Sequence, residues 1–371
     1  MADKTGVRGV REVRGVRGVR GVRAVRAVRG VRGVRAVRAV RGVRGVRAVR
    51  GVRAVRGVLA VLAVLGGLSG CAPGPVGVVM PGSVARARPT TLRVQVREGA
   101  NLVVRDVPIE DYVAAAALSE IHPDAGDAGV AERVFEVQAV IARTYALSNR
   151  GRHAKDGFDL CSTTHCQIYE PGRLVTSRWA ATARDAVSRT AGEVLWFGGA
   201  PARALFHADC GGHTSDAAAV WGGAAPAYLA GSRDGGPAES AHVEWRFETT
   251  SAALRRALDA DTRTDVGATL DRIEVAGRDA AGRAEMITLR GARTFVVRGE
   301  IFRDAMTRAF GAASIRSTLF TVKKSNDRYV FSGKGYGHGV GLCQAGALAR
   351  LKSGARVDSV LSHYFPGTTL R

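Results

Sequence analysis

The sequence predicts an α+β fold for the part of the chain that follows residue 89. Apolar residues recur at helical spacing between residues 108 and 149, and later segments alternate apolar and polar residues in pairs joined by short turns. Near the C-terminus, glycine occupies every second position from 333 to 341. Runs of helix followed by runs of hairpin are typical of α+β proteins. We therefore expect a helical segment packed with β-hairpins and with a glycine-rich strand-helix motif near the C-terminus.

An arginine repeat dominates the charge of the N-terminal end. The chain has 371 residues and a formal net charge of +22. Residues 1–57 repeat Val-Arg-Gly or Val-Arg-Ala and hold 18 basic and two acidic side chains, which leaves 37 basic and 31 acidic ones in residues 58–371. A period of three places arginine on every face of a helix and on both sides of a strand, so we expect this tail to be disordered. A polyanion-binding arm and a start codon assigned too early both explain the repeat. We prefer the second, and the balanced remainder argues against a nucleic-acid-binding protein.

Residues 58–71 have the pattern of an export signal. Eight apolar residues from Val58 to Leu65 follow the arginines, a length that suits the apolar segment of a signal peptide and is too short to span a bilayer. The next residues, Leu68-Ser69-Gly70-Cys71, resemble a bacterial lipobox, which implies lipidation of Cys71. An ordinary secretory signal with an incidental cysteine is the alternative. Residues 72–89 are rich in proline, glycine and alanine and are interpreted as a linker, so we expect the folded domain to cover 90–371.

The first folded elements are a strand over residues 91–96 and a helix that Pro108 opens. An apolar stripe on this helix runs along one face and ends in Glu120; its members are Ile109, Tyr112, Val113, Ala116 and Glu120. Burial and a position in the last turn of the helix both raise the pKa of a carboxyl group. Glu120 is therefore a candidate general acid, and a purely structural pair with Arg143 is the alternative.

The same signals predict the later elements. Apolar residues at helical spacing predict a second helix over residues 130–149 and a further one over 299–310. Alternation around short turns predicts two hairpins, which pair 272–276 with 285–290 and 319–323 with 328–331. We expect the glycines from 333 to 341 to lie in a strand with one bare face, against which a backbone or a sugar ring can pack closely. A dinucleotide-binding loop is excluded because the spacing does not fit one.

Four potential metal ligands lie within fourteen residues: His153, Cys161, His165 and Cys166. Two thiolates and two imidazoles suit a closed tetrahedral zinc site, which leaves no open position for chemistry. We therefore expect a structural zinc ion. A Cys161–Cys166 disulfide is the alternative in an oxidising compartment.

Several motifs, in order along residues 90–371, resemble the stage II sporulation protein D/LytB domain family. These motifs are Pro108–Val113, Ser119-Glu120, Gln138–Tyr145, His207–Thr214 with Val220–Gly223, Gly335–Gly341 with Gln344, and Tyr364–Gly367. The segment around Cys161 and Cys166 also resembles the part of the family that holds zinc in some members. The resemblance implies a lytic transglycosylase, which cleaves the MurNAc–GlcNAc bond of peptidoglycan and leaves 1,6-anhydro ends.

The resemblance also implies roles for individual residues. Glu120 would be the single acid/base, with Arg143 and Tyr145 beside it. The expected substrate-binding residues are His207, Gly211, Gly212, Thr214, Trp221, Tyr336, His338 and Gln344. Cys210 and Cys343 each lie inside a family motif, and we expect their two loops to meet, either as a disulfide or as separate buried thiols.

The rival function is a non-catalytic glycan-binding protein that activates a cell-wall amidase. In either case the expected partners are peptidoglycan strands, with an amidase as a possible second partner. The expected location is the bacterial cell envelope, outside the cytoplasm and anchored by the lipid on Cys71.

Overall fold

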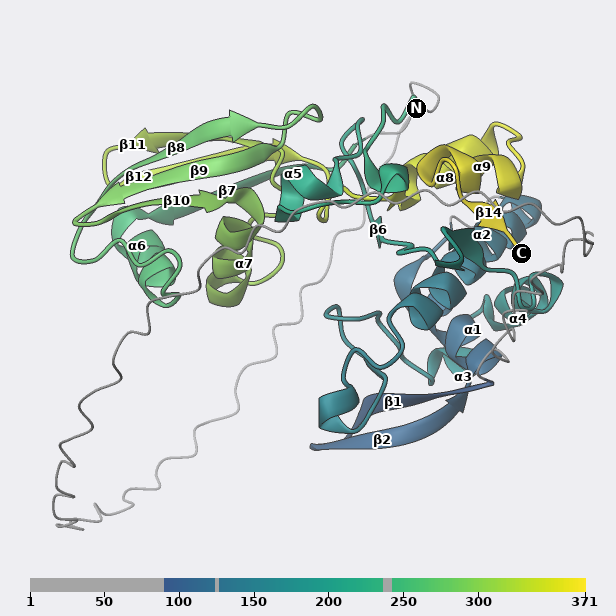
Figure 1. The fold of residues 1–371 in the computed structure, drawn as a ribbon. Coiled ribbons are helices and arrows are strands. Elements are labelled where there is room, and N and C mark those ends of the chain that lie inside the picture. Colours follow the sequence, from purple (N-terminus) through teal and green to yellow (C-terminus); the bar gives the residue numbers. More distant parts are fainter. Residues whose placement is uncertain (1–89, 124–126, 236–241) are drawn as a thin grey trace, which may run out of the picture. The chain divides into compact units, whose positions relative to one another are not determined.

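The computed structural model describes residues 90–123, 127–235 and 242–371 (Figure 1). The repeat (1–57), the export signal with Cys71 (58–71) and the linker (72–89) lie outside these described residues. The described chain contains both helices and sheets, so the predicted α+β class is confirmed. No helix among the described residues is long and apolar enough to cross a membrane.

A small sheet opens the fold. Strand β1 (Thr91–Glu98) pairs antiparallel with β2 (Asn101–Pro108) and parallel with the short β3 (Leu160–Cys161). The predicted strand at 91–96 is therefore confirmed. Alternate residues of β1 (Leu92, Val94 and Val96) are buried, as expected for a strand that covers a core with one face.

Helix α1 (Ile109–Glu120) follows β2, and helix α2 (Ala128–Ser148) follows α1. The fixed backbone of Pro108 starts α1, and the Asp127 carboxylate caps α2 by accepting the Val130 N–H at 3.0 Å. The single apolar stripe predicted for α1 is wrong, because every residue from Tyr112 to Ser119 is buried. Four consecutive alanines in this helix let α2 and α4 (Ala180–Arg189) approach it closely.

Helix α2 also contacts helices α8 (Gln344–Lys352) and α9 (Val357–Tyr364) from the C-terminal end of the chain. These elements share an apolar core with short strands. The strands form two small sheets, which are β4 (Leu195–Phe197) with β5 (Ala200–Pro201) and β14 (Thr369–Leu370), and β6 (Phe206–His207) with β13 (Leu342–Cys343). The remaining helical turns are Ala154–Asp156, α3 (Arg173–Thr176), α5 (Ala217–Trp221) and Ala227–Leu229. Residues 90–235 and 335–371 are called the helical region below.

Residues 242–334 form a β-rich region with its own apolar core. Its two antiparallel sheets are β8 (Leu270–Arg278), β9 (Ala284–Gly291) and β10 (Thr294–Arg298), and β7 (Glu244–Thr250), β12 (Arg328–Lys334) and β11 (Phe320–Ser325). Helices α6 (Ser251–Asp259) and α7 (Gly299–Phe310) lie against the strands, on the lower side of the view in Figure 1. Both predicted hairpins and the predicted helix at 299–310 are confirmed.

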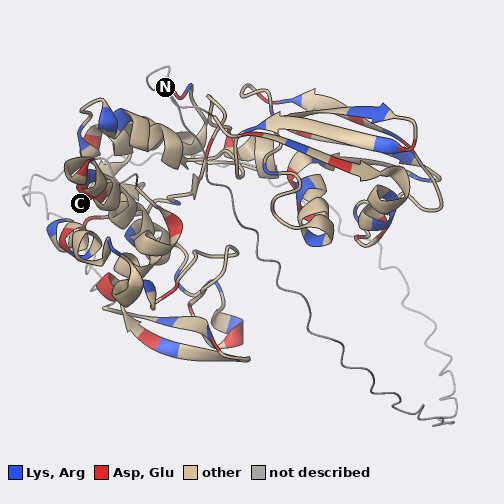
Figure 2. Ribbon diagram, turned by 180° about the vertical axis from the view of Figure 1, so that it is seen from behind, with Lys and Arg blue, Asp and Glu red and all other residues tan. Residues whose placement is uncertain are grey.

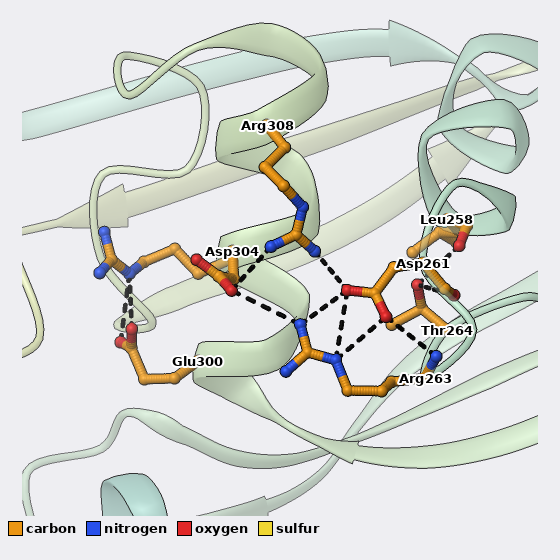
Figure 3. Close-up of polar contacts among 8 residues, drawn as sticks. Leu258, Asp261, Arg263, Thr264, Glu300, Asp304 and Arg308 are labelled. Carbon is orange, nitrogen blue, oxygen red and sulfur yellow. Dashed lines mark hydrogen bonds and ion pairs between the residues drawn. The ribbon is translucent and has the colours of Figure 1, made fainter. Parts of the chain in front are cut away.

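Basic and acidic residues are interspersed along the ribbon of the described elements (Figure 2). A network on the β-rich region illustrates how they pair (Figure 3). Asp261 accepts hydrogen bonds from Arg263 and Arg308, and Asp304 on α7 pairs with both arginines. The guanidinium groups hold the pKa of Asp261 below its usual range. The arginines are half exposed, so this network joins the end of α6 to α7 at the surface.

Candidate active site

Glu120 is the last residue of α1, and the chain turns to an extended conformation at Ile121. Its Oε1 accepts a hydrogen bond from the Ile168 N–H at 2.6 Å. Burial raises the pKa of Glu120 to about 7, although the Ile168 hydrogen bond acts in the opposite direction. The helix C-terminus also disfavours a negative charge there. The other acidic side chains with a clear shift, all outside this site, have lowered pKa values; they are Glu98, Glu248, Asp261, Asp265 and Asp358.

The segment after the Cys/His cluster contacts both the first and the last turn of α1. The Tyr112 hydroxyl donates to Gln167 Oε1 at 3.1 Å, and the Tyr112 ring stacks on Tyr169 with 5.0 Å between ring centroids. One residue further on, the Glu170 N–H donates to the Ser119 hydroxyl at 3.1 Å. These contacts flank Ile168 on both sides, so they fix the position of the N–H that binds the Glu120 carboxylate.

The expected zinc ligands lie together. Their ligand atoms are all within 4.8 Å of one another. Cys166 Sγ lies 3.4 Å from His153 Nε2 and 3.8 Å from His165 Nδ1, and Cys161 Sγ lies 3.7 Å from His165 Nδ1. Tetrahedral zinc with ordinary bond lengths separates sulfur and nitrogen ligands by about 3.6 Å. The four residues therefore fit a zinc ion, and both cysteines are free thiols in the structure.

Arg143 was expected beside Glu120, but its acidic partner in the structure is Glu110. Its guanidinium donates two hydrogen bonds to the Glu110 carboxylate, at 2.6 and 3.0 Å, and others to the backbone carbonyls of Val187 and Glu193. Arg143 is 1% exposed, and Glu110 is the acidic partner that makes its burial tolerable. Arg143 thus forms a structural ion pair, and its partner is Glu110 rather than Glu120.

Tyr145 lies in the apolar core beside the Cys/His cluster. Burial, and then the proximity of Cys166, raise the pKa of Tyr145 to about 12, and the negative charge of Glu120 contributes in the same direction. The hydroxyl is therefore neutral at physiological pH, and it lies close enough to Glu120 for their charges to interact.

The glycine-rich segment near the C-terminus is not a strand beyond Lys334, so that prediction is wrong. Gly335, Gly337, Gly339 and Gly341 all have φ between +72° and +101°, a conformation that other residues rarely adopt. A Cβ on Gly337 would lie 2.8 Å from the His207 Cβ, and a Cβ on Gly341 would lie 2.1 Å from the Leu205 carbonyl oxygen. The expected close approach of another backbone is thus present, and that backbone is the segment that carries His207.

Some expected substrate-binding residues are exposed and others are buried. Trp221 at the end of α5 is 43% exposed, Tyr336 is 37% exposed, and the Trp221 ring lies 5.2 Å from that of His338. The ring of the buried His207 also lies near His338, with 5.5 Å between the two ring centroids. Burial, and then the charges of Arg303 and Arg283, lower the pKa of His338 to about 3, so its ring is neutral.

The remaining expected substrate-binding residues stabilise the loops in which they lie. Thr214 is buried and exchanges hydrogen bonds with the backbone of Ser232. Gly211 and Gly212 have positive φ, and a Cβ on Gly211 would lie 2.7 Å from the Leu319 side chain. Thr214 and His207 therefore do not offer their side chains to solvent.

Gln344 connects the C-terminal motif to Glu120 through hydrogen bonds. Its side-chain amide donates to the Glu120 carbonyl oxygen at 3.3 Å and to Gln138 Oε1 at 3.4 Å. Gln344 follows Cys343, which pairs with His207 in the β6–β13 ladder. The motif around Glu120 and the two later motifs thus meet through Gln344.

Three buried charged residues of this part of the molecule were not predicted. Asp209 accepts hydrogen bonds from the N–H groups of Gly211 and Val243 and contacts His242 at 2.9 Å, which ties the two regions together. Arg283 donates to the backbone carbonyls of Cys210 and Gly337. Asp234 is described below. Asp209 lies inside the motif His207–Thr214, so the sequence could have indicated its role at the site. Nothing near Arg283 or Asp234 in the sequence points to the site.

Comparison with known proteins gives two matching family models. Residues 97–197 match the model described as a stage II sporulation protein, and residues 225–341 match a domain of unknown function. The second match covers much of the β-rich region and the glycine-rich segment.

Three curated proteins are similar to the chain over most of its length. The amidase enhancer of Bacillus subtilis is 27% identical over 68% of this chain and 40% of its own length, so the chain spans about two fifths of that relative. The stage II sporulation protein D of the same organism is 27% identical over 75% of this chain and 78% of its own length. An uncharacterized protein of Brachyspira hyodysenteriae is 31% identical over 72% and 68%, respectively.

Proposed function

The chain belongs to the SpoIID/LytB family, and we propose that it is a lytic transglycosylase that cleaves the MurNAc–GlcNAc bond of peptidoglycan glycan strands. The observation that best supports this proposal is the raised pKa of Glu120. A carboxyl group with a pKa of about 7 is protonated in half of the molecules at neutral pH, and it can both give and take a proton.

A single carboxyl group is sufficient for the lytic reaction. Protonated Glu120 gives its proton to the glycosidic oxygen as the bond from C1 of the muramic sugar breaks. The ionised carboxylate then takes the proton of the C6 hydroxyl of the same sugar as that oxygen bonds to C1. The products are a 1,6-anhydro end and a free C4 hydroxyl, no water is consumed, and Glu120 is protonated again. Hydrolytic glycosidases need a second carboxylate for a nucleophile or for water activation.

The surroundings of Glu120 suit both halves of this cycle. Burial favours the protonated acid, and the Ile168 N–H stabilises the carboxylate that forms after the first proton transfer. Gln344 holds the backbone of Glu120 from the opposite end of the sequence. In this proposal Arg143 supports α1 through Glu110, and Tyr145 remains a neutral hydroxyl in the core near the acid.

The exposed aromatic rings are the proposed sugar contacts. Trp221 and Tyr336 are partly exposed, and aromatic rings pack well on the apolar faces of sugars. Neutral His338 contacts the Trp221 ring and would fix its orientation. In this proposal the buried side chains of His207 and Thr214 stabilise these loops.

We propose that a zinc ion, held by His153, Cys161, His165 and Cys166, has a structural role. Four protein ligands leave no position for substrate, so the ion would supply no catalytic step. It would stabilise the segment that ends in the Ile168 N–H and thereby position the Glu120 carboxylate.

The proposed setting follows from the N-terminal sequence and from the relatives. We propose export to the cell envelope and anchoring through Cys71, outside the described residues. The name of the amidase enhancer favours a second candidate function, in which the chain binds glycan strands and stimulates a separate cell-wall amidase.

A digest of peptide-free glycan strands tests the proposal, with products identified by mass spectrometry. We expect 1,6-anhydro-muramic ends from the wild-type domain and none from Glu120→Gln. Reducing ends in place of anhydro ends would mean that water is the nucleophile. Binding of strands without any cleavage, together with stimulation of an added amidase, would favour the second candidate.

A further inference from the structure

A second cluster of metal-ligand side chains lies away from the first. Strands β6 and β13 pair in parallel, with Cys343 opposite His207, and Cys210 follows β6 by three residues. A ring nitrogen of His207 and the sulfur atoms of Cys210 and Cys343 all lie within 4.8 Å of one another. His207 is 4% exposed and both cysteines are fully buried. The two loops meet as expected, since Cys210 N lies 3.2 Å from Cys343 Sγ, and in the structure the two cysteines are separate thiols.

Backbone N–H groups point at both sulfur atoms. Cys210 Sγ accepts from Gly212 N at 3.2 Å, and Cys343 Sγ accepts from Cys210 N at 3.2 Å and from Gly346 N at 3.3 Å. Hydrogen bonds of this kind favour the thiolate over the thiol. Two buried thiolates side by side are nevertheless unstable without a cation, and the proximity of Cys210 together with burial raises the pKa of Cys343.

The ring of His207 is oriented as metal-binding histidines usually are. Its Nδ1 lies 3.2 Å from the Val340 carbonyl oxygen, which can only accept a hydrogen bond, so Nδ1 carries the proton. Nε2 then bears a lone pair, and this buried atom has no hydrogen-bond partner. Metal-ligating histidines donate one ring N–H to a carbonyl or carboxylate and bind the metal through the other nitrogen.

A carboxylate lies next to the thiols. The Cys210 thiol donates to Asp234 Oδ2 at 3.2 Å. Asp234 is almost fully buried, and its other oxygen accepts from the Tyr364 hydroxyl at 2.8 Å and from Arg350 at 3.4 Å. Asp234 therefore offers an oxygen beside Cys210 while Arg350 balances part of the negative charge.

We propose that His207, Cys210 and Cys343 form a second, structural zinc site, with Asp234 as the neighbouring oxygen donor. Both thiols release their protons to solvent on binding, and thiolate sulfur, imidazole nitrogen and carboxylate oxygen are all donors that zinc takes. This proposal is independent of the lytic reaction. The ion would join β6 to the loop that leads into Gln344, and so to the backbone of Glu120.

Metal analysis of the full chain, purified with zinc and without oxidants, tests the site. The Cys210→Ser/Cys343→Ser variant is expected to hold one zinc fewer per chain than the wild type. The matched control, Cys161→Ser/Cys166→Ser, removes the ligands of the first cluster and is expected to keep the zinc at the second. His207→Gln should weaken zinc binding at the second site by at least about 10–100-fold in a competition with a chelator, the range produced by losing an outer-shell partner alone.

Equal zinc content in the wild type and the Cys210→Ser/Cys343→Ser variant would overturn the proposal, as would a Cys210–Cys343 disulfide in the peptide map. A titration of the metal-free wild type with Co²⁺ does not depend on the folding of any variant. Two equivalents with thiolate-to-cobalt charge-transfer absorption are expected, and saturation at one equivalent bound by Cys161 and Cys166 would contradict the site. Neither result depends on glycan cleavage, so this proposal and the proposed activity can fail separately.

Discussion

The candidate site in the helical region and the surface of the β-rich region place ionisable side chains in opposite environments. At the candidate site Glu120 and His338 are only partly exposed and have no ionic partner, and burial shifts the pKa of the first up to about 7 and of the second down to about 3. In the β-rich region arginine partners lower the pKa of Asp261 and of Glu248, and these pairs lie at the surface. At the candidate site burial stabilises neutral forms, whereas in these surface pairs the arginines stabilise the charged carboxylates.

The difference indicates where chemistry can take place. A group that changes its protonation state near neutral pH is useful for proton transfer, and it reduces stability because its charged form is poorly solvated. A surface ion pair keeps both partners charged and adds little stability. The β-rich region therefore has the character of a scaffold, and the helical region contains the candidate acid.

The largest expected effect comes from Glu120→Gln. The amide can still accept the Ile168 N–H, but it cannot deliver a proton, so we expect kcat on peptide-free glycan strands to fall by about 10²–10⁴-fold with strand binding unchanged. The wild-type rate should decline as the pH rises through about 7, because the acid is then lost. Steady-state kinetics and a pH profile measure both effects.

Glu132→Gln is the matched control for this variant. Glu132 lies on α2 with an exposed side chain that pairs with Arg189, so its loss should leave kcat unchanged. Full activity in Glu120→Gln would remove Glu120 from the mechanism and would end the functional contrast between the two regions.

The next effect concerns the buried arginine of the helical region. Glu110→Ala leaves the Arg143 guanidinium buried without its acidic partner, which typically costs about 3–5 kcal/mol of unfolding free energy. Chemical denaturation at neutral pH measures this loss. In Arg143→Ala, activity per folded molecule should remain. A large loss of kcat in Arg143→Ala with unchanged stability would instead place Arg143 in the catalytic machinery.

A smaller effect is the pH dependence of stability that Glu120 causes. Its pKa is near 4.5 in the unfolded chain and about 7 in the folded one, so the folded state binds the proton more tightly. This contribution to stability is complete below pH 4.5 and disappears as the pH rises to 7. Relative to the wild type, Glu120→Gln should therefore gain on the order of 2–3 kcal/mol between pH 4 and pH 8. Denaturation curves at both pH values measure the gain, and a constant difference would mean that the carboxyl is well solvated.

Much of the fold was predictable because its signals are local. Pro108 opens α1, the turns near 280 and 326 separate alternating strands, and α7 spans the predicted residues. The raised pKa of Glu120 was predictable because a carboxyl at the end of a buried helix is a local pattern as well. The four side chains of the first cluster were expected to lie together for the same reason, since they are close in sequence.

The missed features all depend on contacts between distant segments. Arg143 pairs with Glu110 rather than Glu120 because of the way α1 and α2 pack, which the spacing along one helix cannot reveal. The glycines after Lys334 alternate as in a strand, but each second residue has positive φ to fit against the segment 205–209. Arg283 and Asp234 reach the cysteine cluster from loops without any motif.

The smallest expected effect is that of Asp261→Asn in the β-rich region. The asparagine oxygen can still accept the Arg263 N–H, so the change removes the charge and little else. Arg263 and Arg308 are half exposed and stay solvated, so the loss of unfolding free energy should not exceed about 1 kcal/mol. Added salt should shrink the difference, because ions screen surface charges within about 10 Å.

Denaturation at low and high salt and the glycan digest are the measurements, with activity expected to stay unchanged. A loss as large as that of Glu110→Ala, or a fall in activity, would mean that the charges of the β-rich region are coupled to the site. The two regions could then no longer be regarded as scaffold and site.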